Sequence, residues 1–169
     1  MTQKLEKRRA RAVQGFTIIE VMIVLAIAGL ILLIVFLAVP ALQRSSRNTQ
    51  RKTDVSAVLA AVDDFENNNG GTAPPANSFA IGTDGTLTIS STGMASATAK
   101  LGYYKSGQVT VQTAYQNVTG NPTGDQVTIY EGTRCASATS SAQGNNRQVA
   151  AVYAVETGGG TYAWQCQEG

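Results

Sequence analysis

The stretch RAVQGFTIIEVMIVLAIAGL, residues 11–30, joins a basic segment to an apolar run and places one carboxylate inside that run. The basic segment ends at Gly15, and the apolar run begins at Phe16. Glu20 is the fifth residue of the run when Phe16 is counted as the first. A charge in an apolar segment is expensive, at roughly 2.5–3.5 kcal/mol in the centre of a bilayer. The position of Glu20 therefore requires a specific explanation.

The apolar run is long enough to cross a membrane. Residues 21–39 contain no polar side chain, and a helix of these 19 residues would extend about 28 Å, close to the ~30 Å hydrocarbon core. The run is too long for the core of an ordinary secretory signal, and no clean A-x-A site follows it. Basic residues before the run favour a cytoplasmic N-terminus. The sequence therefore predicts one membrane-spanning helix with the C-terminus outside.

A polar helical segment follows the apolar run. Pro40 comes first and is expected only to bend a continuous helix. Arg44, Arg47 and Arg51 are spaced by three and four residues, so a helix would place them on one face. We expect this face to be solvated and to touch lipid headgroups, in preference to nucleic acid.

After this polar segment the pattern changes to apolar residues at helical spacing. Five residues, at i, i+3, i+4, i+7 and i+10, form an amphipathic stripe: Val55, Val58, Leu59, Val62 and Phe65. Asp63, Asp64 and Glu66 lie near its end, and we interpret them as a solvated helix face rather than a metal site. The residues NNNGG, 67–71, predict the end of the helix.

Residues beyond the helix indicate β-structure. Residues 72–107 are loop-like, with one candidate strand at 86–90. Better strands are predicted from alternation and turn signals at 108–115, 126–130, 147–156 and 160–166. Short connections between them imply antiparallel pairing. The predicted fold class is α+β, with a long N-terminal helix packed on an antiparallel sheet of about four strands.

The amino-acid composition of the chain excludes several classes of function. Residues 1–15 hold five basic side chains and one acidic, whereas residues 16–169 hold eight basic and ten acidic. This balance does not support a nucleic-acid-binding domain, and we identify no nucleic-acid site. The chain has no histidine, and it lacks a Ser-Lys, Cys-His or paired-carboxylate signature. We therefore expect neither an enzyme nor a cofactor or metal site.

The segment GFTIIE, after a short basic leader and before a long apolar helix, resembles the class III signal peptide of type IV pilin precursors. The order of the remaining elements resembles the type IVa plan. The resemblance implies that a membrane peptidase cuts between Gly15 and Phe16 and that Phe16 is then N-methylated. It also implies that Glu20 neutralises the new amine, its own or a neighbour's, in the filament core. The alternative is a glutamate tolerated near a helix start, where the helix dipole favours it.

The resemblance also divides the chain into parts. Residues 1–15 are expected to be a cleaved leader, 16–40 the transmembrane and polymerisation helix, 41–66 its amphipathic continuation, and 67–169 a globular β domain. Gly29 occupies a position where many pilins have glycine, whereas Pro40 lies three residues later than the usual pilin proline.

Cys135 and Cys166 are the two cysteines of the chain. On an exported domain they would be oxidised to a disulfide, which would add roughly 3–4 kcal/mol to the free energy of unfolding. The alternative is two unrelated buried thiols. We predict the disulfide, because the predicted topology places both cysteines outside.

The expected function is that of a structural subunit of a type IV pilus, supporting adhesion, twitching motility or DNA uptake. The expected partners are copies of the same chain, a prepilin peptidase and methyltransferase, the membrane assembly platform with its motor ATPases, and lipid before assembly. The expected location is the inner membrane and afterwards the extracellular pilus. A pseudopilin of a type II secretion system is the first alternative, and a membrane-anchored binding module, receptor or enzyme is the second.

Overall fold

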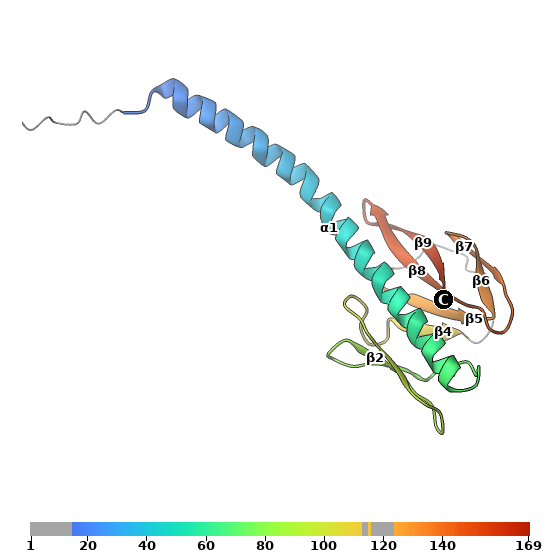
Figure 1. The fold of residues 1–169 in the computed structure, drawn as a ribbon. Helices are drawn as coiled ribbons and strands as arrows, with labels where there is room; N and C mark the ends of the chain where they lie inside the picture. The colour runs from blue at the N-terminus through green and yellow to red at the C-terminus, as the bar shows by residue number, and fades with distance from the viewer. Residues whose placement is uncertain (1–14, 113–114, 116–123) are drawn as a thin grey trace, which may run out of the picture. The chain divides into compact units, whose positions relative to one another are not determined.

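A computed structural model of the chain describes residues 15–112, 115 and 124–169. Within these residues the chain forms one long helix followed by nine strands (Figure 1). The elements are α1 Ile18–Asn68, β1 Phe79–Ile81, β2 Thr86–Ile89, β3 Ala97–Lys100, β4 Val109–Gln112, β5 Val127–Glu131, β6 Thr133–Ser137, β7 Ser140–Gln143, β8 Val149–Gly158 and β9 Thr161–Glu168. The predicted α+β class is confirmed.

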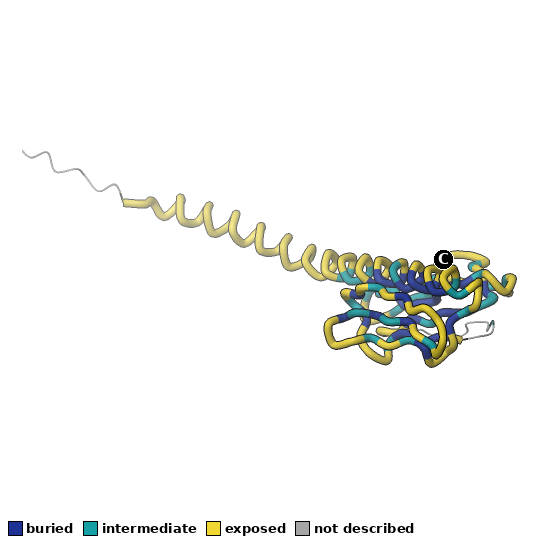
Figure 2. The backbone as a smooth tube through the Cα atoms, turned by 60° about the horizontal axis from the view of Figure 1, so that its bottom comes forward, coloured by how far each residue is buried: buried dark blue, intermediate teal, exposed yellow. Residues whose placement is uncertain are grey.

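The chain divides into two compact units, Met1–Ala41 and Leu42–Gly169. In the described part of the first unit, every residue is exposed. In the second unit, the remainder of α1 packs on the strands, and its buried residues face them (Figure 2). A hydrophobic core of the chain's own residues therefore lies in the second unit.

The core contains the predicted helical stripe. All five of its residues are buried, from Val55 to Phe65. The strands supply the opposite side through alternating residues, because successive side chains of a strand point to opposite faces. The strand residues in the core include Leu87, Ile89, Val109, Val111, Val127, Ile129, Val149, Ala151 and Tyr153.

The helix ends where the NNNGG segment predicts. Gly70 and Gly71 have φ angles of 68° and 81°, in the left-handed region that glycine adopts without a Cβ penalty. The Gly71 N–H donates to the carbonyl of Glu66 at 2.7 Å. This bond satisfies one of the carbonyls left without a partner at the helix end.

The sheets differ from the prediction in number and direction. The four best predicted strands correspond to β4, β5, β8 and β9, which form one sheet in the order β4-β5-β8-β9. Its β4–β5 pair is parallel, so the sheet is mixed rather than antiparallel. The connection spans residues 113–126, and a connection of about a dozen residues is long enough to return the chain to the same end of the sheet. The turn signals within it do not mark a tight hairpin.

The prediction missed four short strands. β1 and β3 flank the predicted strand β2 in a three-stranded antiparallel sheet, and β6 and β7 form a separate hairpin. The sequences of β3, β6 and β7 are dominated by small and polar residues, so they lack the β-branched alternation used for the other strands. Of the predicted strand 108–115, residues 113–114 lie outside the described part of the chain.

Candidate functional site

The described residues before α1, 15–17, are exposed to solvent. Phe16 is 89% exposed. No atom lies within 4 Å of the position that a Cβ on Gly15 would occupy, and the Gly15 φ angle is outside the left-handed region. Nothing in the described fold therefore requires glycine at position 15. The predicted leader residues 1–14 lie outside the described part.

Glu20 belongs to a capping box at the start of α1. Thr17 immediately precedes the first helical residue, Ile18, and Glu20 is the third helical residue. The Thr17 N–H and hydroxyl donate to Glu20 Oε2 at 2.8 and 2.7 Å, and the Glu20 N–H donates to Thr17 Oγ1 at 3.3 Å. This reciprocal arrangement satisfies backbone donors that a helix start leaves unpaired. Both hydrogen bonds that the carboxylate accepts within the described residues end on Oε2.

Thr17 is a site residue that the sequence prediction missed. The spacing of Thr17 and Glu20, T-x-x-E directly before an apolar run, is the sequence signature of a capping box. The signal was therefore present in GFTIIE itself. The structure gives Glu20 a helix-starting role within its own chain, which agrees with the alternative explanation considered above.

The apolar helix that follows the capping box is uncovered. Large apolar side chains from Ile18 to Leu42 are all exposed to 39% or more. Among the described residues, α1 is the one helix with the length and composition to cross a membrane. Exposed apolar surface on this scale marks a membrane or protein interaction site.

The comparisons with known proteins identify the N-terminus. Residues 10–36 match the family described as Prokaryotic N-terminal methylation motif. The matched motif indicates a type IV pilin-like prepilin. No curated protein and no solved structure matches the chain. The family motif belongs to structural pilin-type proteins and not to an enzyme family.

In the basic stretch of α1 after the apolar run, the expectation of a solvated face was wrong for Arg51. Arg51 is 1% exposed. Its guanidinium donates to the carbonyl of Ala154, the hydroxyl of Tyr103, and the carboxylates of Asp125 and Glu156. The sequence pattern could not reveal this burial, because each of these partners lies more than 50 residues further along the chain.

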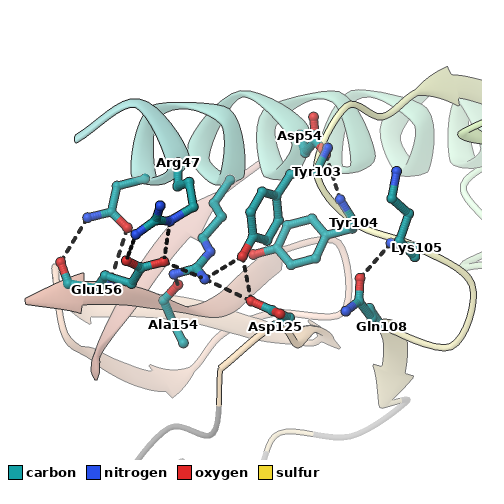
Figure 3. A network of polar contacts seen from close by, with 11 residues as sticks. Arg47, Asp54, Tyr103, Tyr104, Lys105, Gln108, Asp125, Ala154 and Glu156 are labelled. Atoms are coloured by element: carbon teal, nitrogen blue, oxygen red, sulfur yellow. Dashed lines mark hydrogen bonds and ion pairs between the residues drawn. The ribbon is translucent and has the colours of Figure 1, made fainter. Parts of the chain in front are cut away.

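Glu156 receives a second arginine, and together these contacts form the Arg51 network (Arg47, Arg51, Tyr103, Asp125 and Glu156; Figure 3). Arg47 donates in a bidentate manner, from Nε to Oε1 at 2.9 Å and from Nη2 to Oε2 at 2.6 Å. The hydrogen bonds from Arg47 lower the pKa of Glu156. Asn48 also bonds both the N–H and the carbonyl of Glu156. The network fixes α1 to β8.

A second polar side chain of α1 holds a loop. Asp54 is buried and accepts hydrogen bonds from three successive N–H groups, those of Gly102, Tyr103 and Tyr104, at 2.9, 2.7 and 3.1 Å. A buried carboxylate is tolerated only when it is paired or hydrogen-bonded, and here the loop supplies the donors. Asp54 therefore ties α1 to the segment that leads from β3 to β4.

The predicted disulfide is confirmed. Cys135 in β6 is bonded to Cys166 in β9, with a Cα–Cα distance of 5.7 Å. The Cys166 N–H donates to the Ala138 carbonyl at 2.7 Å, and the Cys135 N–H donates to Glu168 Oε1 at 2.6 Å. The disulfide and these hydrogen bonds thus attach the β6–β7 hairpin to β9.

The acidic residues near the end of α1 divide into two kinds. Asp63 and Asp64 are exposed, as expected, whereas Glu66 is partly buried and its Oε1 atom has no hydrogen-bond partner. Glu131, at the end of β5, also has a buried, unpartnered Oε1, and burial together with the charge of Glu66 raises its pKa to about 7. Across the described residues, no group of three or more Asp, Glu, His or Cys side chains could hold a metal ion.

Proposed function

We propose that this prepilin is cleaved between Gly15 and Phe16, methylated at Phe16, and polymerised through its N-terminal helix into a type IV pilus. The observation that carries the proposal is the uncovered apolar part of α1, directly after the methylation motif. Within the chain nothing covers these side chains in the described residues. A membrane before assembly, and equivalent helices afterwards, would cover them.

The glycines of the N-terminal segment fit this proposal. Gly15 has no structural requirement in the described fold, so its selection fits an enzyme that needs close approach to the backbone. Gly29 lies within α1 and nothing occupies the space beside it. A glycine inside a helix costs roughly 0.5–1 kcal/mol relative to alanine. Small residues allow close contact between helices in a membrane, which offers a compensating gain in a helical assembly.

Glu20 would act in two stages. In the described chain, Thr17 holds its Oε2 atom and starts the helix. Cleavage would create a positive amine on Phe16, the residue next to Thr17. The Oε1 atom would then neutralise this amine, either its own or that of a neighbouring subunit. Removing one partner of a buried ion pair costs about 3–5 kcal/mol, so the pair would select one axial position for an incoming subunit.

The partners follow from this pathway. Cleavage and methylation require a prepilin peptidase and methyltransferase, and polymerisation requires copies of the chain, an assembly platform and motor ATPases. The processed chain would be a single-pass inner-membrane protein before assembly and part of an extracellular fibre afterwards. The role is structural, and we propose no enzymatic activity.

A pseudopilin of a type II secretion system is the second candidate, because the methylation motif is compatible with both. The disulfide between Cys135 and Cys166 favours the pilin, since major pseudopilins usually lack a C-terminal cysteine pair.

Two measurements test the proposal. Mass spectrometry of the processed chain should find methylated Phe16 at the N-terminus, and an unprocessed chain would exclude both candidates. Fibres sheared from the cell surface should contain the chain. Confinement of processed chain to the cell envelope would favour the pseudopilin.

A further inference from the structure

Asn69 and Gly70 form the single Asn–Gly pair of the sequence. Asparagine before glycine is chemically labile in water, because no side chain on the following residue hinders attack by its backbone nitrogen. In this reaction the Gly70 nitrogen bonds to Asn69 Cγ, the Cγ–Nδ2 bond breaks, and ammonia leaves with the Gly70 proton. Water then opens the resulting succinimide to an aspartyl or isoaspartyl residue.

The structure holds the Asn69 amide in a clamp, which we define as its three side-chain hydrogen bonds. Nδ2 donates to the Phe65 carbonyl at 2.7 Å and to the Ala95 carbonyl at 2.9 Å. Oδ1 accepts from the Ala95 N–H at 2.8 Å. Ala95 lies between β2 and β3, so the clamp connects the end of α1 to the turn of another element.

The clamp opposes the reaction geometrically. Attack requires Cγ to rotate toward the Gly70 nitrogen, and this rotation breaks the paired bonds to Ala95. The backbone is restrained as well, because Gly71 N–H donates to the Glu66 carbonyl at 2.7 Å and Thr72 N–H donates to the Asn69 carbonyl at 3.3 Å. Reaction therefore requires local opening of the helix end, which is a minor population of a folded protein.

We propose that Asn69 is a deamidation site. It stays unmodified while its clamp is closed and is converted to an aspartyl or isoaspartyl residue when the end of α1 opens. Conversion then keeps that end open. An aspartate cannot donate to Phe65 and Ala95, and its carboxylate oxygen would face both carbonyls. Its charge would also lie at the C-terminus of a helix, where the dipole disfavours an anion, and within six residues of Asp63, Asp64 and Glu66 in the sequence. The isoaspartyl product would lengthen the backbone in the helix-ending turn.

The conversion is measured in the full-length chain in detergent micelles at mildly alkaline pH, folded and in urea. Digestion and mass spectrometry report the replacement of NH2 by OH at Asn69. We expect conversion in the folded chain to be about tenfold slower or more than in urea. A synthetic peptide containing NNNGG, with and without urea, corrects for the effect of urea on the chemistry. Equal corrected rates in the folded and unfolded chain would show that the clamp does not protect Asn69. The absence of conversion in urea would show that Asn69 is not a deamidation site.

The consequence of conversion is tested with Asn69→Asp and its matched control Asn68→Asp. Both add one charge at the end of α1, but Asn68 is exposed and takes no part in the clamp. Asn69→Asp should lower the melting temperature by several degrees relative to Asn68→Asp and accelerate proteolysis near residue 70. Equal melting temperatures and equal proteolysis would show that the clamp does not hold the helix end.

Discussion

Replacing Glu156 by glutamine tests the Arg51 network most directly. The substitution preserves size and one acceptor oxygen but removes the charge that serves both arginines. Arg51 would stay 1% exposed with Asp125 as its remaining anion, and that carboxylate is 49% exposed. Breaking a buried ion pair costs about 3–5 kcal/mol. Because Asp125 remains, we expect a loss of about 2–3 kcal/mol in the free energy of unfolding.

Two companion variants separate the buried charge from the surface pair. Arg47 is 43% exposed, and exposed pairs contribute about 0–1 kcal/mol, so Arg47→Met should cost less than about 1 kcal/mol. Adding Arg51→Met to Glu156→Gln removes the uncompensated charge and should recover a large part of the loss. Measuring the single variant Arg51→Met as well completes a double-mutant cycle for Arg51 and Glu156.

The assay is urea unfolding of a fragment that begins at Leu42, which retains the second compact unit and its core. A loss of about 2–3 kcal/mol should lower the urea midpoint by roughly 1–2 M for a domain of this size. A midpoint for Glu156→Gln equal to that of the unchanged fragment would refute the reasoning. So would a double variant that is no more stable than Glu156→Gln alone, because the buried charge would then not be the cause.

Four further outcomes are expected. Gly15→Val should leave the leader attached, and N-terminal sequencing that begins at Phe16 in this variant would contradict the proposed cleavage. Glu20→Ala should be cleaved but form few or no fibres by electron microscopy, and normal fibre levels from Glu20→Gln would exclude charge neutralisation. Cys166→Ser should make the β6–β7 hairpin sensitive to protease, and unchanged digestion would show that the disulfide is dispensable there. The pKa of Glu131 is raised to about 7, so ionisation of its carboxyl group opposes folding. The stability that the protonated carboxyl group contributes is therefore present below pH ~4.5 and is lost as the pH rises through 7. Glu131→Gln should therefore make the free energy of unfolding less dependent on pH. It should also stabilise the domain by about 1–2 kcal/mol at pH 8, after allowance for solvent screening at this partly buried group. A variant that is less stable than the unchanged domain at pH 8 would contradict the raised pKa.

Local signals in the sequence determined several features without reference to distant residues. GFTIIE and the apolar run that follows it predicted the prepilin N-terminus, which the methylation-motif match bears out. The spacing from Val55 to Phe65 predicted the buried stripe of α1, and the two glycines predicted its end. The capping box was also available locally, because Thr17 and Glu20 are only three residues apart. These features follow from periodicity and short-range hydrogen bonding, which neighbouring residues encode.

Features that depend on distant contacts were decided only by the tertiary structure. Arg51 resembles a surface residue in sequence, and it is buried because Tyr103, Asp125 and Glu156 meet it from three other segments. The parallel pairing of β4 and β5 depends on where the chain returns after residue 126, which no local turn signal specifies. β6 and β7 consist largely of small and polar residues, and their hairpin is held by the disulfide and by each other rather than by an apolar alternation. The sequence by itself determined where the apolar surface and the helix lie. Only the folded structure showed how the buried charge of Arg51 is neutralised, because its partners are far from it in the chain and come within hydrogen-bond distance only on folding.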